Sequence, residues 1–497
     1  MKFDVVVIGS GIGGLTAGAL LARYGKTVLV CESHTIPGGA AHSFSQRGFH
    51  FDSGPSFYCG LGSEPSLNPL KQVLDALEES LEVVRYDPLG HYHFPEGTLP
   101  IWSNLHQYRQ AIAQFTSQGA IELERFEQRL LSLYDCLKEI PTITLRADWQ
   151  VVPVLLSRFP ALVKMLPQLG VVNSSVGDIM DREVHDPWVR RLIDLECFLL
   201  SGLKAHGTIA PEVAFMLGER HRAGVEYPVG GSGAIVKALV SGLERWGGKL
   251  RLRSHVEQIL VASGQVTGVQ LRSGEVIEAP IVISNATVWD TYGKLLRPED
   301  LPTACQQQLA TPAIDSFMHL HLGITADGLD RLSGHHVVVH SSERDLTEPG
   351  NTCMISIPSV WDRSLAPTGH HVVHAYTLEP YQGWQQAGYE ERKQQRAQPL
   401  YRALETVIPD LSDRISLELI GTPLTHARFL RRHQGTYGPA IPAGQGLFPS
   451  CHTPISGLYR VGDSTLPGIG VPAVAASGIL CANTLVPLRQ TKKMLNH

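Results

Sequence analysis

Short runs of consecutive apolar residues predict buried strands at the start of the chain. Val5 to Ile8 is continuously apolar, and Thr27 to Cys31 contains a second such run. A strand that is apolar at every position is typical of a central parallel strand covered on both faces. The segment from Gly13 to Tyr24 has the spacing of a helix. Together these elements predict a right-handed βαβ unit at the start of a doubly wound sheet.

The hydrophobic pattern changes after about residue 76. Helical periodicity extends from Leu105 to Cys136, and an apolar stretch interrupted by prolines runs from Val151 to Leu169. These features indicate a separate helical layer. Beyond a helix expected at Ala234 to Trp246, short strands return. They are expected at Val256 to Leu260, Val266 to Leu271, Ile281 to Ser284 and, before a last Gly/Pro-rich turn and helix, Leu458 to Val461.

A glycine-rich turn joins the first strand to the first helix. Gly9, Gly11 and Gly14 match G-x-G-x-x-G in the context that a dinucleotide-binding turn requires. The first glycine permits the tight turn, the second lets the backbone approach a pyrophosphate, and the third lets the helix pack on the strand. The helix N-terminus favours phosphate charge. Glu32, at the end of the second strand, is placed to accept hydrogen bonds from a ribose diol, which disfavours NADP.

A second glycine turn favours FAD over NAD. Gly38 and Gly39 follow Pro37, and a turn at this place lets a loop pass close to an extended FAD, although an ordinary Pro-Gly turn is the alternative. Near the C-terminus a strand, an acid, a glycine turn and a helix N-terminus occur again around Gly462 and Asp463. Backbone N–H groups there could face the ribityl chain or the flavin ring. We therefore expect non-covalently bound FAD.

These elements predict the α/β class, with a Rossmann-type FAD-binding domain and a discontinuous α+β substrate domain. A chain of 497 residues has room for two or three domains. Residues 1–75, 225–300 and 421–497 are expected to form the FAD-binding domain. Residues 76–224 and 301–420 are expected to form the substrate- and membrane-facing domain.

Composition narrows the partners. The net charge is −5 without clustered Lys or Arg, which excludes a nucleic-acid surface. Eight scattered cysteines without a Cys-x-x-Cys pair argue against zinc, iron–sulfur clusters and disulfides, so no metal and a reducing compartment are expected. With a first strand beginning at Phe3, no targeting segment is expected, and we predict a cytoplasmic protein. Leu466 to Leu488 is uncharged and long enough to span a bilayer, but its Gly/Pro-rich start contradicts a regular spanning helix.

The glycine turns, Glu32 and the Gly462–Asp463 pair resemble the amine oxidase and phytoene desaturase superfamily of flavoproteins. Further segments are similar to its carotenoid cis–trans isomerase branch, in order along nearly the whole chain. These segments are Gly48 to Gly54, Tyr227 to Gly231, Ile283 to Thr291, Gly421 to Pro439 and Gly457 to Gly478. The resemblance implies that the backbone of Val256 contacts the adenine. The chain departs from the superfamily at Ala40, Ala41 and His42, where desaturases usually have an Arg and the isomerases small serines.

The resemblance implies an FAD-dependent enzyme acting on a long polyene, with redox-neutral cis-to-trans isomerisation of a poly-cis carotene such as prolycopene favoured. It also implies an external electron donor for the flavin. A carotenoid or retinoid desaturase or saturase is the alternative. Amine oxidation fits less well because Val471 and Pro472 are aliphatic where an aromatic residue is expected over the flavin. A non-catalytic FAD-binding scaffold is a further alternative.

No catalytic side chain is assigned. His221, His426 and His433 are polar candidates on the substrate side, each interpreted as a hydrogen-bonded structural residue. Arg428, Arg431 and Arg432 form a basic run at helical spacing, typical of a solvated helix face or of a contact with lipid phosphate. The residues expected to contact FAD are Gly9, Gly11, Ile12, Gly13, Gly14, Glu32, Gly38, Gly39, Val256, Gly462, Asp463, Gly470, Val471 and Ala473.

Because carotenes partition into bilayers, we expect a peripheral membrane protein. The apolar stripe of Val151 to Leu169 is the candidate surface, with Arg158 and Lys164 able to extend their charges to the headgroups. The alternative for this stretch is a buried lid helix over a substrate tunnel.

Overall fold

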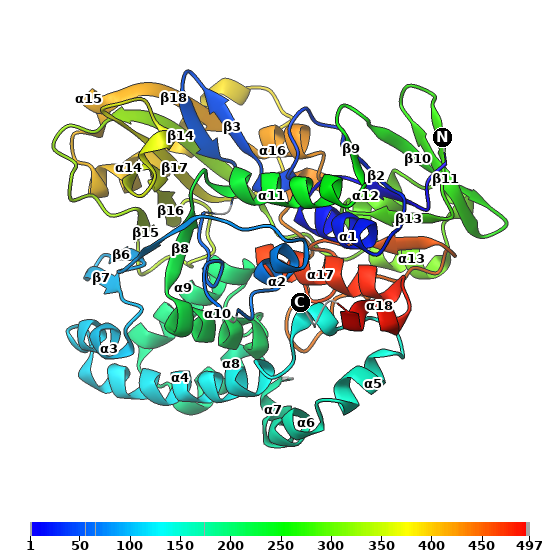
Figure 1. Ribbon diagram of the computed structural model, residues 1–497. Helices are drawn as coiled ribbons and strands as arrows, with labels where there is room; N and C mark the ends of the chain where they lie inside the picture. The colour runs from blue at the N-terminus through cyan, green and yellow to red at the C-terminus, as the bar shows by residue number, and fades with distance from the viewer. Residues whose placement is uncertain (1, 55, 65, 173, 494–497) are drawn as a thin grey trace.

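A five-stranded parallel sheet forms the centre of one half of the molecule (Figure 1). The structure is a computed structural model, and it describes residues 2–54, 56–64, 66–172 and 174–493. The strand order is β19-β13-β1-β2-β9, and each neighbouring pair is parallel. The strands are β1 (Val5–Ile8), β2 (Val28–Cys31), β9 (Lys249–Arg251), β13 (Ile281–Ser284) and β19 (Leu458–Arg460).

Both faces of this sheet are covered, as the apolar runs predict. Along β1, Val5 and Val7 belong to one hydrophobic core and Val6 and Ile8 to another. The first core contains α1 (Ile12–Arg23), α2 (Pro69–Ala76), α11 (Ser232–Arg245) and α17 (Val471–Thr484). The second contains α12 (Val288–Gly293), α13 (Thr303–Gln308), β10 (Val256–Ala262), β11 (Gln265–Leu271) and β12 (Val276–Glu278).

The uncharged stretch near the C-terminus forms α17, which packs against α1. Ala475 and Ile479 of this helix are fully buried within the first core. None of the helices in the described part of the chain combines the length and the hydropathy that a membrane-spanning helix needs.

A seven-stranded sheet dominates the other half, in the order β18-β14-β17-β16-β15-β6-β7. All of its pairs are antiparallel except β15 with β6. The strands are β6 (Gly90–Phe94), β7 (Gly97–Ile101), β14 (Ser316–Thr325), β15 (His335–Val339), β16 (Thr352–Ser356), β17 (His370–Glu379) and β18 (Ile415–Gly421).

The two faces of this sheet pack against different helices. Met318, Leu320 and Leu322 of β14 share a core with α14 (Tyr389–Val407). On the opposite face Phe317 and Met354 share a core with the helical layer. That layer contains α3 (Leu105–Ala113), α4 (Ser117–Leu137), α8 (Val176–Glu183), α9 (Pro187–Ser201) and α10 (Ala210–Ala223).

The helical periodicity from Leu105 to Cys136 corresponds to two helices rather than one. The chain leaves α3 at Gln114, and the Thr116 side chain then accepts a hydrogen bond from Gly119 N. Threonine is a favourable N-cap, because its side-chain oxygen satisfies an N–H group that has no partner within the helix. A second helix, α4, therefore begins directly after Thr116.

The apolar stretch after Trp149 forms short helices at the edge of the molecule, at the bottom of Figure 1. They are α5 (Val151–Leu156), α6 (Phe159–Met165), a 3₁₀ turn (Leu166–Gln168) and α7 (Leu169–Val172). Several of their large apolar side chains are about half exposed or more: Val152, Leu156, Phe159, Val163 and Leu166. The stretch is therefore on the surface, although it does not form one continuous helix.

Smaller elements complete the fold. They are β3 (Ser43–Gln46) paired with β4 (Phe49–Asp52), β5 (Val83–Tyr86) paired with β8 (Val225–Pro228), α15 (Leu411–Arg414), α16 (Pro423–Leu430) and α18 (Leu488–Lys493). The remaining 3₁₀ turns are Gly39–Ala41, Thr142–Thr144, Pro298–Asp300, Pro358–Val360, Arg363–Leu365 and His433–Gly435. The predicted division into discontinuous domains stays a prediction. Residues 1, 55, 65, 173 and 494–497 belong to the predicted domain ranges but lie outside the described residues.

Candidate functional site

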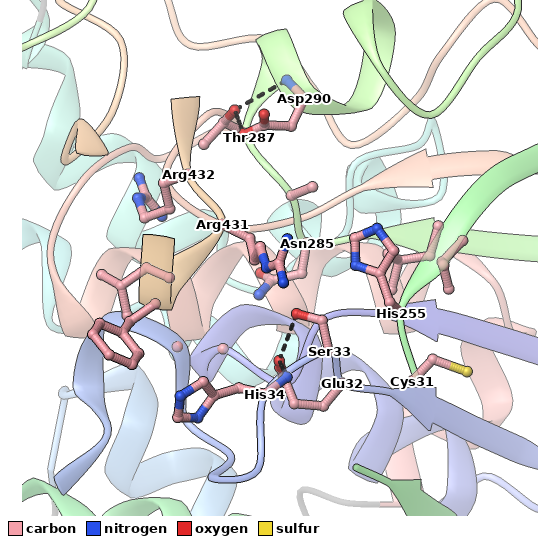
Figure 2. A pocket seen from close by; sticks show the side chains of 18 of the residues that line it. Cys31, Glu32, Ser33, His34, His255, Asn285, Thr287, Asp290, Arg431 and Arg432 are labelled. Atoms are coloured by element: carbon pink, nitrogen blue, oxygen red, sulfur yellow. Dashed lines mark hydrogen bonds between the residues drawn. The ribbon is translucent and has the colours of Figure 1, made fainter. Parts of the chain in front are cut away.

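The carboxyl ends of β1, β2 and β13 meet at a cavity of about 480 Å³, called cavity A here. In an open α/β sheet this edge is the usual place for a ligand. Figure 2 shows Glu32, Asn285, Arg431 and Arg432 around it. Its lining includes Gly9, Gly11, Glu32, His34, Gly39, His42, His255, Val256, Asn285, Lys294, Arg431 and Arg432.

The two predicted glycine turns lie against each other at cavity A. Gly38 N donates to Ser10 O over 3.0 Å, and a Cβ on Gly39 would lie 3.1 Å from Gly11 Cα. Helix α1 begins directly after Gly11, whose residue type supplies no side-chain cap. The first N–H groups of a helix have no partner within it, so they remain available to an anionic ligand. The turns thus form a narrow cradle that suits a pyrophosphate.

Glu32 is buried at the end of β2 and is already engaged in hydrogen bonds. Its Oε2 accepts from Ser10 N at 2.8 Å and Ser10 Oγ at 2.7 Å, and its Oε1 accepts from His34 N at 2.8 Å. These bonds hold the carboxylate at the wall of cavity A. A carboxylate has about four acceptor positions, and Ser33 Oγ takes the fourth by donating to Oε1 over 3.3 Å, so a ribose diol would have to replace a serine hydroxyl as donor.

The basic run does not form one helix face, because Arg428 lies within α16 whereas Arg431 and Arg432 follow its end; the contact with lipid phosphate stays a prediction. Helix α16 ends at Leu430, and Arg431 has φ 55°, in the left-handed region. Arg431 and Arg432 both line cavity A, and Arg432 forms an ion pair with Asp463. Their charges therefore lie beside the glycine cradle.

Cavity A adjoins a second cavity of about 260 Å³, cavity B, because Gly11, Ala40, Asn285 and Arg432 line both. Cavity B also contains residues from the turn after β19 and the start of α17. The predicted residues that line it are Gly11, Ile12, Gly13, Gly38, Gly462, Asp463, Gly470 and Val471. Cavities A and B therefore lie side by side, and together they are called the cleft here.

Two predicted contact residues line neither cavity. Gly14 is buried, and a Cβ there would lie 2.4 Å from Gly9 O, so its role is to let α1 pack on the turn. Ala473 is half-buried in the first turn of α17. The structure therefore places Gly14 and Ala473 behind the cleft surface rather than on it.

Asn285 is a site residue that the sequence reasoning missed. Its N donates to Ile8 O over 2.9 Å, which fixes the residue directly after β13. Its side chain covers the glycine cradle, because a Cβ on Gly11 would lie 2.5 Å from Asn285 Nδ2 and one on Gly462 2.8 Å from Asn285 Oδ1. A polar residue after the third buried strand was the signal that could have identified it.

Cavity B is bordered by a cluster of buried histidines, defined here as His319, His321, His374 and His426. His319 Nδ1 lies 2.9 Å from His374 Nε2, and the His321 and His374 rings stack at 4.2 Å. Burial holds the pKa values of His319 and His374 well below the usual value. Burial also lowers the pKa of His321 to about 4 and that of His426 to about 3. All four imidazoles are therefore neutral at pH 7.

The three histidines singled out from the sequence have different surroundings. His221 Nδ1 lies 3.0 Å from Ser103 O, and the His433 ring stacks on Trp289 at 4.9 Å. His426 Nδ1 lies 3.3 Å from Gly435 O, but this residue also belongs to the histidine cluster. Across the described residues, no group of three or more His, Cys, Asp or Glu side chains is arranged to hold a metal ion.

A third cavity of about 140 Å³, cavity C, adjoins cavity B, because Leu199, Leu200, Met354 and Tyr376 line both. Most of its lining surface is apolar. None of the residues from Val151 to Val172 lines cavity A, B or C. The cleft with its anion cradle thus lies next to a largely apolar chamber, which fits an extended dinucleotide beside an apolar substrate.

Comparison with known proteins identifies relatives along nearly the whole chain. The profile of the flavin containing amine oxidoreductase family matches residues 12–486. The chloroplastic prolycopene isomerase 2 of an Oncidium hybrid cultivar is 37% identical over 495 residues, which cover 97% of this chain and 83% of that protein. The neurosporene-forming phytoene desaturase of Cereibacter sphaeroides is 26% identical over 505 residues, which cover 96% of this chain and 93% of that protein.

Solved structures agree on the fold. An oxidoreductase from Methanosarcina mazei superposes with a TM-score of 0.64 at 21% identity, over 96% of this chain and 99% of that one. The predicted α/β class with a Rossmann-type flavin-binding fold is confirmed, as is the resemblance drawn from the motifs. The chain therefore belongs to the family of flavin-containing amine oxidoreductases and is a relative of the prolycopene isomerases.

Proposed function

We propose that the protein is an FAD-dependent enzyme that isomerises a poly-cis carotene such as prolycopene to the trans form without net redox change. The relationship to prolycopene isomerases supports the substrate class. The observation that carries the proposal is the adjacency of cavities A, B and C, because it sets a dinucleotide cradle next to a largely apolar chamber. A long hydrocarbon gains free energy by leaving water for such a chamber.

FAD is the cofactor that suits the whole cleft. In this proposal the adenosine half occupies cavity A, with Glu32 on the ribose and the Val256 backbone on the adenine. The flavin half extends into cavity B, past Gly462 and Val471. Arg431 lines cavity A and Arg432 lines both cavities, where positive charge would favour the pyrophosphate. Bound FAD would supply the reversible electron or hydride transfer that lowers the bond order of a polyene double bond.

The chain's own residues hold and orient the substrate. Leu199, Leu200 and Met354 exclude water between cavities B and C, and Tyr376 adds an aromatic wall. Because the histidine cluster is neutral, no fixed charge lies beside the apolar substrate. A charged imidazole would lose its hydration when an apolar chain covers it, which is unfavourable. No described acid or base needs to act on a substrate that exchanges no proton.

The alternative, a desaturase or saturase, differs in mass balance. An isomerase leaves the product mass unchanged, whereas a desaturase removes two hydrogens per new double bond and needs an electron acceptor. The 37% identity to an isomerase against 26% to a desaturase favours isomerisation. The G-x-G-x-x-G turn from Gly9 to Gly14 is used for FAD in this proposal, so it is not available to bind a nicotinamide dinucleotide as well. We therefore propose that an external donor reduces the flavin.

The test uses FAD-loaded, prereduced enzyme under anaerobic conditions without a quinone. We expect many equivalents of a cis-carotene to be converted at constant product mass, measured by chromatography with mass spectrometry, while the oxidised enzyme stays inactive. A strict requirement for an electron acceptor, with a product lighter by two hydrogens, would assign the desaturase function instead.

We also propose that the protein is cytoplasmic and docks on a membrane surface through α5 to α7. The exposed apolar side chains Leu156 and Phe159 support this, together with the exposed cations Arg158 and Lys164. No acidic residue occurs between Asp148 and Asp178. Such a combination suits insertion between anionic lipid headgroups. The lid alternative lacks support because the stretch lines none of the three cavities.

The discontinuous domain division is part of the proposal. The five-stranded sheet takes its strands from residues 5–31, 249–284 and 458–460, and the seven-stranded sheet from residues 90–101 and 316–421. This pattern supports an FAD-binding domain and a substrate domain assembled from interleaved segments.

A further inference from the structure

A row of side chains crosses the seven-stranded sheet beneath cavities B and C. His319 pairs in register with Tyr376, Tyr376 with Met354, Met354 with Val337, and Val337 with Tyr92. The row spans four strand spacings from β14 to β6, or about 19 Å at about 4.8 Å per spacing. All five side chains line cavity B or C. The chamber therefore runs across the strands, away from the glycine cradle.

The far end of this chamber carries a buried ion pair. Glu196 lies on α9 one turn before Leu199 and Leu200, and Arg220 of α10 donates from Nη1 to Glu196 Oε1 over 3.2 Å. Their side chains are only 15% and 2% exposed, and both line cavity C. Tyr92 of β6 also lines cavity C, whereas neither Glu196 nor Arg220 lines cavity B, so the pair lies toward the β6 end of the row.

The pair has unused hydrogen-bonding capacity. Within the described residues, Nε and Nη2 of Arg220 have no hydrogen-bond partner, and Nδ1 of His91, which also lines cavity C, has none. A buried polar group without a partner destabilises the protein, and a charged group does so more strongly. A pure hydrocarbon in cavity C would leave the guanidinium in this state. Both nitrogens are closed off from cavity C, so an oxygen at the end of the substrate would relieve this state only if the guanidinium turned toward the cavity.

We propose that cavity C binds a hydroxylated end group, so that the enzyme accepts polyenes with a terminal hydroxyl and binds them more tightly than hydrocarbons. The hydroxyl donates its hydrogen to Glu196, the more exposed partner of the pair, and its oxygen accepts from Arg220 once the guanidinium has turned toward the cavity. A carboxylate is disfavoured because it would face Glu196 and the nearby Glu127, whose charge also acts on Arg220. The inference rests on the proposed function, because it requires a polyene in cavity B.

The test compares two polyenes of equal length and cis geometry, a hydrocarbon and its analogue with one terminal hydroxyl. Binding to FAD-loaded enzyme is measured by quenching of tryptophan fluorescence, and kcat/KM by chromatography of the isomerised products. We expect the hydroxylated analogue to bind about tenfold more tightly, the size of one hydrogen bond to a charged group. Equal affinities for the two polyenes would overturn the inference, because they would mean that the terminal hydroxyl gains nothing from Arg220 and Glu196.

Variants then assign the preference to the pair. Removing one partner alone would leave a buried charge, so Glu196→Leu and Arg220→Leu are combined, a replacement that is often tolerated. We expect the ratio of the two dissociation constants to fall to about one. The matched control is Glu219→Leu with Arg222→Leu, which removes a 2.8 Å ion pair on the same helix that lines none of the three cavities. This control is expected to keep the tenfold ratio.

The outcomes separate the two proposals. If wild-type enzyme binds neither polyene, the proposed function fails together with the inference. If it isomerises the hydrocarbon but shows no preference, only the inference fails. A preference that persists in the Glu196→Leu/Arg220→Leu variant would also overturn it, because another group would then recognise the hydroxyl.

Discussion

His319 and His374 lie diagonally on the neighbouring strands β14 and β17, with Nδ1 of the first 2.9 Å from Nε2 of the second. Both imidazoles are neutral, so each carries one N–H. If His319 donates, its Nε2 is a free acceptor and His374 Nδ1 is a free donor; if His374 donates, these roles are exchanged. Neither outer nitrogen has a partner among the described residues. Whichever histidine donates, the two outer nitrogens are therefore one hydrogen-bond donor and one acceptor.

The first prediction concerns the coupling within this pair. His374→Phe leaves His319 Nδ1 buried without a partner, and we expect it to lower the free energy of unfolding by about 1–3 kcal/mol beyond any packing change. Adding His319→Phe removes the orphaned group, so the double variant is expected to lose less than the sum of the two single variants. Urea denaturation of all four proteins measures the coupling. Strict additivity would show that the 2.9 Å contact contributes nothing.

The second prediction is a loss of stability in mild acid. Unfolded histidine takes up a proton near pH 6.5, whereas burial lowers the pKa of His321 to about 4. Between these values the unfolded chain binds more protons than the folded one, so stability falls as the pH falls from about 6.5 to 4. At 1.36 kcal/mol per pKa unit, His321 accounts for about 3 kcal/mol of this loss.

The comparison with His321→Gln isolates this contribution from other titrating groups. Glutamine can still donate to Asp52 O, the carbonyl that lies 3.2 Å from His321 Nε2. We expect the variant to lose less stability than the wild type between pH 6.5 and 4, measured by urea denaturation at several pH values. Parallel pH profiles for the two proteins would contradict the assignment.

The third prediction tests the glycine cradle. Gly11→Val places a branched side chain where a Cβ already lies 2.5 Å from Asn285 Nδ2, at the point where cavities A and B join. We expect the purified variant to lose bound FAD, measured by the flavin absorbance released on heating, and to remain folded by circular dichroism. Gly170→Val is the control, because a Cβ there has no neighbour within 4 Å. Full flavin content in Gly11→Val would contradict the proposed position of FAD.

The fourth prediction concerns membrane docking. Leu156 and Phe159 are each 60% exposed, so replacing both with Asp changes little in the core but adds charge where the apolar face would enter the lipid. We expect the variant to shift to the supernatant when it is sedimented with phosphatidylcholine vesicles that contain phosphatidylglycerol, while FAD stays bound. Ile121→Asp with Val276→Asp, at other exposed apolar positions, is expected to sediment like the wild type. Unchanged sedimentation of the first variant would remove α5 to α7 from the proposal.

The sequence by itself determined the Rossmann unit and its acid. β1, α1 and β2 are consecutive, and each boundary has a local physical cause: a continuous apolar run, a glycine turn and a helical spacing. The same locality explains why three site residues were found: Gly11 directly precedes α1, Glu32 directly follows β2, and Asp463 lies in the turn after β19. Most of the predicted contact residues line cavity A or B for this reason.

Only the tertiary structure decided which distant residues share the cleft. His319, His374 and His426 come from two strands and a helix that are far apart in the sequence, and no spacing announces that their rings will meet. Local reasoning failed at Arg431, because helical spacing was extended past Leu430, where the backbone turns into the left-handed region. It also could not choose between a lid and an exposed surface for α5 to α7. An apolar stripe favours burial in protein and in lipid alike, and which one is available depends on how the rest of the chain packs.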